Sequence, residues 1–241
     1  MLEGLYSAAA GMAAQQQRMD TLANDVANVN TTGYKHTRVA FRDLLYTQDR
    51  TGVVSSGAGA GATSIGRGFA QGGLRETGNK LDVAIEGDGF LQVRRPDGST
   101  ALTRDGSLRL DPNGRVTTQR GELLQPAITV PAGTPEADLR IAQDGTVSAG
   151  DRPLGRIQLV TVRAPQALQS AGDNLFVATA ASGPAQPMAG GRVVQGALES
   201  SNVDLTDSMT QLMESQRTFQ MASKAVQMQD QILQIANEVK Q

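Results

Sequence analysis

The chain holds one histidine, His36, and no cysteine among its 241 residues. A lone imidazole can serve as a general base or a metal ligand, but both roles need partner groups close by. Because cysteine is absent, disulfides, thiolate metal sites and cysteine nucleophiles are excluded. We therefore expect His36 to be a surface side chain without a catalytic role.

Other short motifs give no better candidate for chemistry. EGDGF at 86–90 and DPNGRV at 111–116 lack the spacing of a calcium loop and fit tight turns better. GAGAG at 57–61 resembles part of a nucleotide loop, but no Lys-Ser/Thr pair follows it. The serine nucleophile pattern G-x-S-x-G does not occur. These residues predict no enzyme, no cofactor and no metal site.

Composition narrows the class of protein further. Hydrophobic residues make up 39% and aromatics only 3%, so the core must be built from Leu, Val, Ile, Ala and Met. The net charge of −2, without a basic stripe, argues against nucleic-acid binding. No apolar run is long enough to cross a membrane. The N-terminal residues lack the pattern of a secretory signal, so we expect no cleaved signal peptide.

Helix-breaking residues are concentrated in the middle of the chain. All nine prolines lie between Pro96 and Pro187, and glycine is sparse before Gly33 and absent after Gly196. This distribution predicts an α+β fold, with long terminal helices paired as a coiled-coil-like unit around an antiparallel β-rich middle. Four segments are expected: a helix with its exit turn, a Gly/Ala-rich connector, a β-rich domain and a second helix, at 1–48, 49–80, 81–198 and 199–241.

The N-terminal segment has a heptad pattern. Its two apolar positions repeat over four heptads, with Gln15 as a polar exception. The pattern predicts a helix of about 28 residues that ends at Thr31, Thr32 and Gly33, because glycine readily closes a last turn. The predicted seam residues are Leu5, Met12, Met19, Leu22, Val26 and Val29.

The C-terminal segment has two apolar stripes. Asp204 or Ser201 is expected to cap its helix. The first stripe repeats every seven residues: Leu205, Leu212, Phe219, Val226 and Leu233. The second lies on another face: Met221, Ala225, Met228, Ile232, Ile235 and Val239. Two stripes imply two buried faces. One partner is expected to be the N-terminal helix and the other a second molecule, although a purely intramolecular helix pair is the simpler alternative.

The middle of the chain predicts strands and turns. Residues 51–73 are rich in Gly, Ala and Ser and suggest an extended or flexible connection. Alternating apolar residues predict strands within 81–95, 99–111, 155–163 and 174–180. PDGS, RDGS, DPNG and QDGT punctuate them as turns that need Gly or Asn at positive φ.

Four long motifs resemble one known family. The segment ending in ANDVANVNTTGYKHTRVAFRDLLY resembles the N-terminal motif of bacterial flagellar rod and hook proteins. NKLDVAIEGDGFLQV, LTRDGSLRLDPNGRV and the segment from GALESSNVDL to QDQILQ are similar to later motifs of that family, in the same order. DLLY, LQPAITVPAG, GDNLF and SKAVQMQDQILQ are most similar to the distal rod branch, with the proximal rod branch as the alternative.

The resemblance implies a structural subunit that polymerises with copies of itself into a helical tube. Such a tube transmits torque from motor to hook and lets export substrates pass. Its subunits lie in the periplasm and cell wall after flagellar type III export. Neighbouring rod and hook proteins are implied partners, with ring proteins and the export apparatus as candidates. The terminal helices would line the tube and the β domain would form the outer layer.

The resemblance also suggests a role for the amide-rich end of the first helix. Asn24, Asn28 and Asn30 would form hydrogen bonds at a crowded turn or to a neighbouring subunit, while Thr31, Thr32 and Gly33 would set the exit from the helix. Two other classes of protein are weighed: a secreted adhesin-like binding module, for which aromatic residues are too few, and a peptidoglycan hydrolase, for which no catalytic constellation exists.

Overall fold

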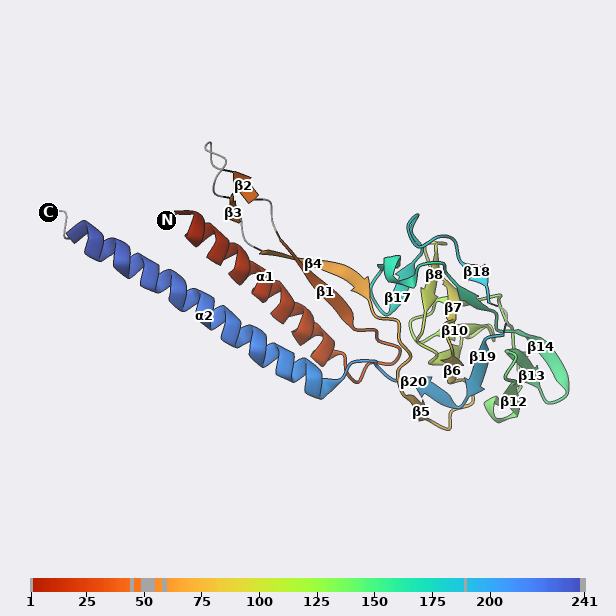
Figure 1. Cartoon of the computed structure of the whole chain (residues 1–241). Coiled ribbons are helices and arrows are strands. Elements are labelled where there is room, and N and C mark those ends of the chain that lie inside the picture. The colour runs from red at the N-terminus through yellow and green to blue at the C-terminus, as the bar shows by residue number, and fades with distance from the viewer. Residues whose placement is uncertain (1, 44–45, 49–54, 58–59, 189, 239–241) are drawn as a thin grey trace. The chain divides into compact units, whose positions relative to one another are not determined.

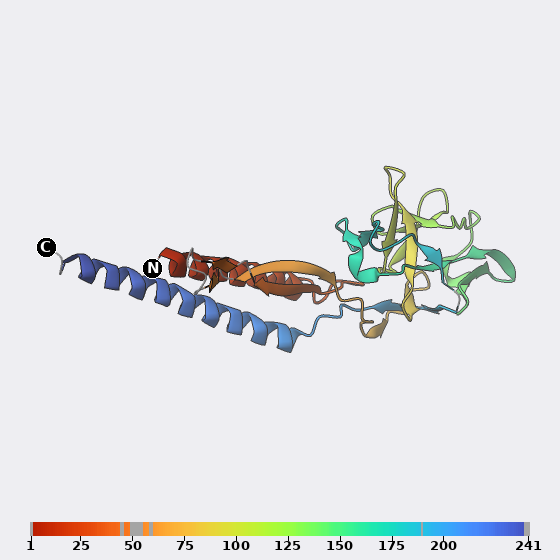
Figure 2. The same ribbon diagram turned by 45° about the horizontal axis from the view of Figure 1, so that its top comes forward.

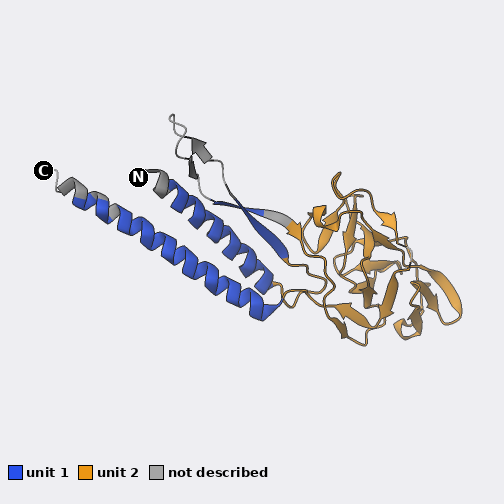
Figure 3. Cartoon of the chain, viewed as in Figure 1, with its two compact units in different colours: residues 1–27, 37–65, 204–241 blue, residues 28–36, 66–203 orange. Residues whose placement is uncertain are grey.

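The computed structural model describes residues 2–43, 46–48, 55–57, 60–188 and 190–238 (Figure 1). The chain forms two compact units, which we describe separately (Figure 3). Unit 1 comprises Met1–Ala27, Thr37–Ile65 and Asp204–Gln241, and unit 2 comprises Asn28–His36 and Gly66–Val203. Two long terminal helices and an antiparallel β-rich middle confirm the predicted α+β class. The four predicted segments remain a prediction.

Unit 1 is built on two helices, α1 (Leu2–Ala27) and α2 (Leu205–Glu238), which pack against each other. They run antiparallel (Figures 1 and 2). Asp204 caps α2 as predicted, because its carboxylate Oδ1 accepts a 3.0 Å hydrogen bond from the backbone N–H of Asp207. An acidic cap also interacts favourably with the positive end of the helix dipole.

Four strands complete unit 1. They are β1 (Thr37–Asp43), β2 (Tyr46–Gln48), β3 (Ser55–Gly57) and β4 (Ala60–Arg67), of which β4 ends in unit 2. β1 pairs with β4, and β2 pairs antiparallel with β3. Residues 55–57 and 60–67 of the Gly/Ala-rich segment are therefore paired strand, whereas residues 68–73 form no strand. The strand part is extended, which is one of the two predicted states.

The largest sheet of unit 2 has the order β16-β17-β8-β7-β11-β10-β9, and β15 joins β7 to β18. The described strand pairings in this sheet are antiparallel. Its strands are β7 (Phe90–Arg94), β8 (Thr100–Thr103), β9 (Leu108–Leu110), β10 (Val116–Thr118), β11 (Leu123–Gln125), β15 (Leu159–Thr161), β16 (Gln169–Ser170), β17 (Leu175–Val177) and β18 (Gln186–Pro187).

Smaller antiparallel sheets surround it: β12-β13-β14, β19-β6 and β20-β5. Their strands are β5 (Leu74–Glu76), β6 (Val83–Glu86), β12 (Leu139–Ile141), β13 (Thr146–Ala149), β14 (Arg152–Arg156), β19 (Arg192–Gln195) and β20 (Ala197–Glu199). Short 3-10 helices lie at Glu136–Asp138 and Pro165–Ala167.

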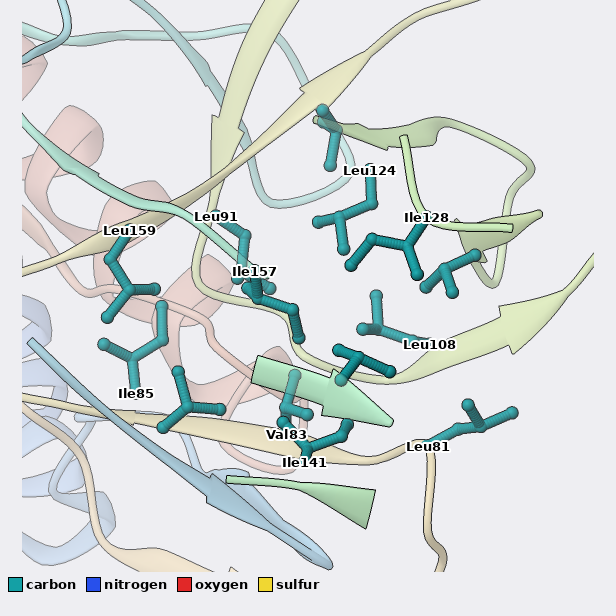
Figure 4. Close-up of a cluster of buried hydrophobic side chains, with 14 of the residues drawn as sticks. Leu81, Val83, Ile85, Leu91, Leu108, Leu124, Ile128, Ile141, Ile157 and Leu159 are labelled. Carbon is teal, nitrogen blue, oxygen red and sulfur yellow. The ribbon is translucent and has the colours of Figure 1, made fainter. Parts of the chain in front are cut away.

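The main core of unit 2 is aliphatic, as the composition predicted. Figure 4 shows its side chains converging from several strands, among them Val83, Ile85, Leu91 and Leu124. A second cluster differs from that expectation because it contains phenylalanines. Phe69, Phe90 and Phe176 meet edge to face, with ring centroids 5.1 to 6.4 Å apart. Such aromatic contacts add stability beyond the burial of area.

Two local predictions were wrong. Residues 155–163 do not form one strand: β14 ends at Arg156 and β15 begins at Leu159, because the chain leaves its pairing with β13 to pair with β7. The turn PDGS has Gly98 at φ 83°, as predicted, but Gly106 in RDGS is not at positive φ. Glycine is required there because a Cβ would lie 1.6 Å from the carbonyl oxygen of Val83.

Candidate functional site

The positions that the α1–α2 pair buries most deeply are mainly small residues. Ala14, Ser208 and Ser215 are the most buried positions of this helix pair besides Asp25. Small side chains allow close approach of two helix axes. The predicted seam residues with described side chains in the helices are partly buried, namely Met12, Met19, Leu22, Val26, Leu212, Phe219 and Val226, whereas Leu205 is exposed. The side chains of Leu5 and Leu233, and all of Val239, lie outside the described residues.

The second stripe of α2 is open to solvent within this chain. Met221, Met228, Ile232 and Ile235 are between 58 and 64% exposed. Met209 and Met213, which the sequence analysis did not single out, are also about half exposed, at 50% and 54%. Contiguous apolar surface of this kind marks interaction sites in soluble proteins.

Polar groups weaken the helix pair from inside. Among the described residues, Gln15 Oε1 and Ser215 Oγ are buried without a hydrogen-bond partner. Each such atom costs roughly 1–3 kcal/mol. Asp25 is the opposite case, because its carboxylate accepts the backbone N–H of Thr37 at 3.2 Å and so ties the start of β1 to α1.

The predicted end of the first helix was wrong. α1 ends at Ala27, and residues 28–36 form a turn that belongs to unit 2. We call this segment the exit turn. Within it, Asn28 accepts hydrogen bonds from Thr31 through both its carbonyl oxygen, at 3.0 Å, and its Oδ1, at 3.1 Å. Asn30 is exposed, as is Asn24 on α1.

Gly33 does not close the helix. Its φ is 67°, and its N–H donates to the carbonyl oxygen of Glu199 at 2.8 Å rather than to a carbonyl of α1. A Cβ at this position would lie 2.7 Å from the backbone of Arg104. The neighbouring Thr32 carbonyl accepts a 2.8 Å hydrogen bond from Asn174 Nδ2. The exit turn is therefore seated directly on the β-rich part of its own unit.

Three buried charges hold the exit turn in place. Lys35 Nζ lies 2.6 Å from Glu199 Oε1, and Arg104 Nη1 lies 3.2 Å from Glu199 Oε2. The side chains of Lys35 and Glu199 are fully buried, and that of Arg104 is 1% exposed. Lys35 also donates to the carbonyl oxygen of Ala70 at 2.7 Å. We call these three residues the charge cluster.

In the charge cluster, burial and ion pairing shift the pKa of Lys35 in opposite directions. Burial lowers the pKa of Lys35, while Glu199 opposes that shift through a hydrogen bond and its charge. Arg104 stacks over the Phe90 ring at 5.1 Å. Sequence reasoning missed all three residues. The available signal was a lone acid, Glu199, at the end of the otherwise apolar strand β20.

His36 is not the expected surface side chain. It is partly buried, and its backbone N–H donates to Asn202 Oδ1 at 2.8 Å. Asn202 Nδ2 in turn donates to the carbonyl oxygens of Gly68 and Ala70. A Cβ at Gly68 would overlap the His36 ring, so the two segments lie in close contact. His36 is thus part of a structural junction, in which its ring packs against Gly68 and lies within hydrogen-bond distance of Asn202.

This arrangement is suited to holding segments together. The charge cluster is closed to solvent, so no substrate reaches it. Within the described residues, no group of three or more metal-ligating side chains is found. No described helix is long and apolar enough to cross a membrane.

Comparison with known proteins identifies the chain. Three family models match it: Flagella basal body rod protein at 5–35, Flagellar hook protein FlgE/F/G D1 domain at 84–149, and Flagellar basal body rod FlgEFG protein C-terminal at 194–239. Flagellar basal-body rod protein FlgG of Borreliella burgdorferi is 39% identical, over 100% of this chain and 99% of the relative. The chain belongs to the flagellar basal-body rod protein family. FlgG of Bacillus subtilis is likewise 38% identical, over 97% of both chains.

Family membership confirms the predicted distal rod branch. FlgF of Caulobacter vibrioides, a member of another branch, is 32% identical over 93% of this chain, below the values for the FlgG proteins. The chain is therefore a structural, non-enzymatic subunit of the flagellar basal-body rod. The charge cluster takes one residue from each matched segment: Lys35, Arg104 and Glu199.

Proposed function

We propose that the chain polymerises with copies of itself into a helical tube whose inner wall is made by α1 and α2. Such a tube transmits torque from motor to hook and lets exported substrates pass through its channel. Neighbouring rod and hook proteins are its end-to-end partners, with ring proteins and the flagellar export apparatus as further neighbours. Family membership supports a place in the flagellar rod. The exposed apolar stripe on α2 is the observation that supports polymerisation.

The energetics of the helix pair favour assembly. Five large apolar side chains of α2 are more than half exposed, and burying each would contribute about 1–2 kcal/mol. The buried but unpaired Gln15 and Ser215 oxygens offset part of the stability of the isolated pair. Burial of these side chains against a neighbour would therefore stabilise the helix pair. We therefore treat Asn24, Asn28, Asn30, Thr31 and Thr32 as candidate neighbour contacts as well.

A charge placed in the predicted seam tests the proposal. Leu212 and Val226 are partly buried on α2, so Leu212→Asp or Val226→Asp would place an unpaired carboxylate between packed surfaces. We expect at least a tenfold loss of sedimentable polymer and loss of motility, while unit 2 keeps its thermal transition. Gln220→Asp, at an exposed position of α2, is the matched control and should assemble normally. Normal motility in both seam variants would contradict the proposal.

A further inference from the structure

Unit 1 contains a hollow on its surface. It has a volume of about 230 Å³, and its apolar lining comes from Leu22 of α1 and from Val39 and Phe41 of β1. Arg18 and Gln211 form its polar rim, with Arg18 Nη2 donating to Gln211 Oε1 at 3.3 Å. The Arg18 guanidinium also lies 5.7 Å from the centre of the Phe41 ring. These contacts fix the rim, while Phe41 remains 42% exposed.

The part of the exposed stripe of α2 from Met228 onward lies far from this hollow. Met228 follows Gln211 by 17 positions in one continuous helix, which is about 26 Å at 1.5 Å per residue. The register set by the Arg18–Gln211 hydrogen bond places Leu2 opposite about residue 227. The C-terminal end of α2 extends past the described start of α1 (Figures 1 and 2). By this register Met228 lies level with that start, and Ile232 and Ile235 lie beyond it. α1 does not cover them.

We infer that the stripe of one copy docks head-to-tail on the hollow of a second copy, with Met228 inserting beside Leu22, Val39 and Phe41. This inference rests on the proposed function and specifies its contact. A stiff helix cannot bring Met228 to the hollow of its own chain, so in this contact the methionine belongs to a second copy. A hollow of this size accommodates a methionine side chain, and a thioether against an aromatic ring is a favourable contact.

The surroundings of the two surfaces also match. Gln227 and Gln231, which flank Met228 on α2, are exposed amides. The rim of the hollow offers a guanidinium and an amide, Arg18 and Gln211, to such groups. The stripe exposes an apolar area on the order of several hundred Å². This is a substantial share of the roughly 800 Å² that each partner buries in a standard interface.

The contact has a consequence for assembly. The two surfaces differ, and each copy carries one of each, so the interface is heterologous. Heterologous contacts that do not close into a ring produce open filaments. The competing arrangement is a symmetric one, in which the stripes of two copies pack on each other and the hollow stays empty.

Disulfide trapping distinguishes the two arrangements, and the natural chain is suited to it because it has no cysteine. Full-length Phe41→Cys and Met228→Cys proteins are mixed in equal amounts under assembly conditions and oxidised with diamide. We expect disulfides between the two variants at least tenfold more abundant than those within either. Gln220→Cys in place of Met228→Cys is the matched control on an exposed part of α2, and should not couple to Phe41→Cys.

Every outcome bears on the inference. Disulfides mainly between two Met228→Cys copies would establish stripe-to-stripe packing and overturn it. Polymers that form without any Phe41–Met228 disulfide would also overturn it, while the proposed function would stand. If the cysteine-free protein does not polymerise at all, as followed by sedimentation, the proposed function fails and the inference fails with it.

Discussion

Glu199 is the residue on which the exit turn depends most. Its carboxylate pairs with both Lys35 and Arg104 in a site closed to solvent. Removing one partner of a buried ion pair typically costs about 3–5 kcal/mol, because the remaining charge is left uncompensated. We expect Glu199→Gln to lower the stability of unit 2 by about that amount in thermal or urea unfolding. Glu76→Gln, on the exposed strand β5, should change stability very little, and equal effects of the two variants would contradict this role.

Gly33 makes a second prediction for a single residue. An alanine there would have to adopt φ 67° and place its Cβ 2.7 Å from the Arg104 backbone, which cannot move aside easily. Strain and overlap together predict a loss of about 2–4 kcal/mol in the unfolding of unit 2. Gly11→Ala is the matched control, because its Cβ would meet nothing within 4 Å in a helix. That variant should stabilise α1 by about 0.5–1 kcal/mol.

The turns between strands predict a dependence on pH. Hydrogen bonds from the backbone and guanidinium of Arg115 lower the pKa of Asp111 in the DPNG turn below 3.8. The unfolded chain therefore binds this proton more readily, so the stabilisation is complete above the unfolded value and is lost as pH falls through the lower folded pKa. Asp111→Asn should flatten the stability profile between pH 2 and 5 in urea unfolding. An Asp111→Asn profile as steep as that of the natural chain would contradict this role of the turn.

The elements with local signals could be predicted from the sequence. Heptads fix the two helices because a period near 3.6 leaves few alternatives, and Asp204 has the acceptor that an N-cap needs. The turn at Gly98 followed from its PDGS pattern. In contrast, the end of α1 was placed too late, because Gly33 serves a distant backbone contact and not the helix.

Contacts between distant segments could not be predicted, because they leave no pattern in the spacing of residues along the sequence. Lys35 and Glu199 are 164 positions apart, and a lysine after a turn reads as a surface residue until the fold buries it. Likewise, β4 lies within the Gly/Ala/Ser-rich stretch 51–73, whose composition does not reveal its pairing with β1. The hollow near Phe41 combines two helices and a strand, so only the assembled unit defines it.

At the scale of the whole molecule, the two units differ in how many hydrophobic residues they bury. Among the described residues, Ala14 is the one buried hydrophobic residue of unit 1, whereas unit 2 holds two apolar clusters. Local opening is cheapest where few apolar contacts are lost, so the backbone amides of α1 and α2 should exchange with solvent much faster than those of unit 2. We expect protection at least a hundredfold lower in α1 and α2 for the unassembled protein, measured by hydrogen exchange.

The same measurement on assembled protein completes this prediction. If neighbours bury the stripe of α2, its amides should become as protected as those of strands β7 and β8, while unit 2 changes little. Residues 28–36 serve as an internal control, because the charge cluster should keep the exit turn protected in both states. Strong protection of both helices before assembly would mean that the α1–α2 contact alone is stable. Polymerisation would then have to be driven by the stripe and the hollow, without any ordering of the helices.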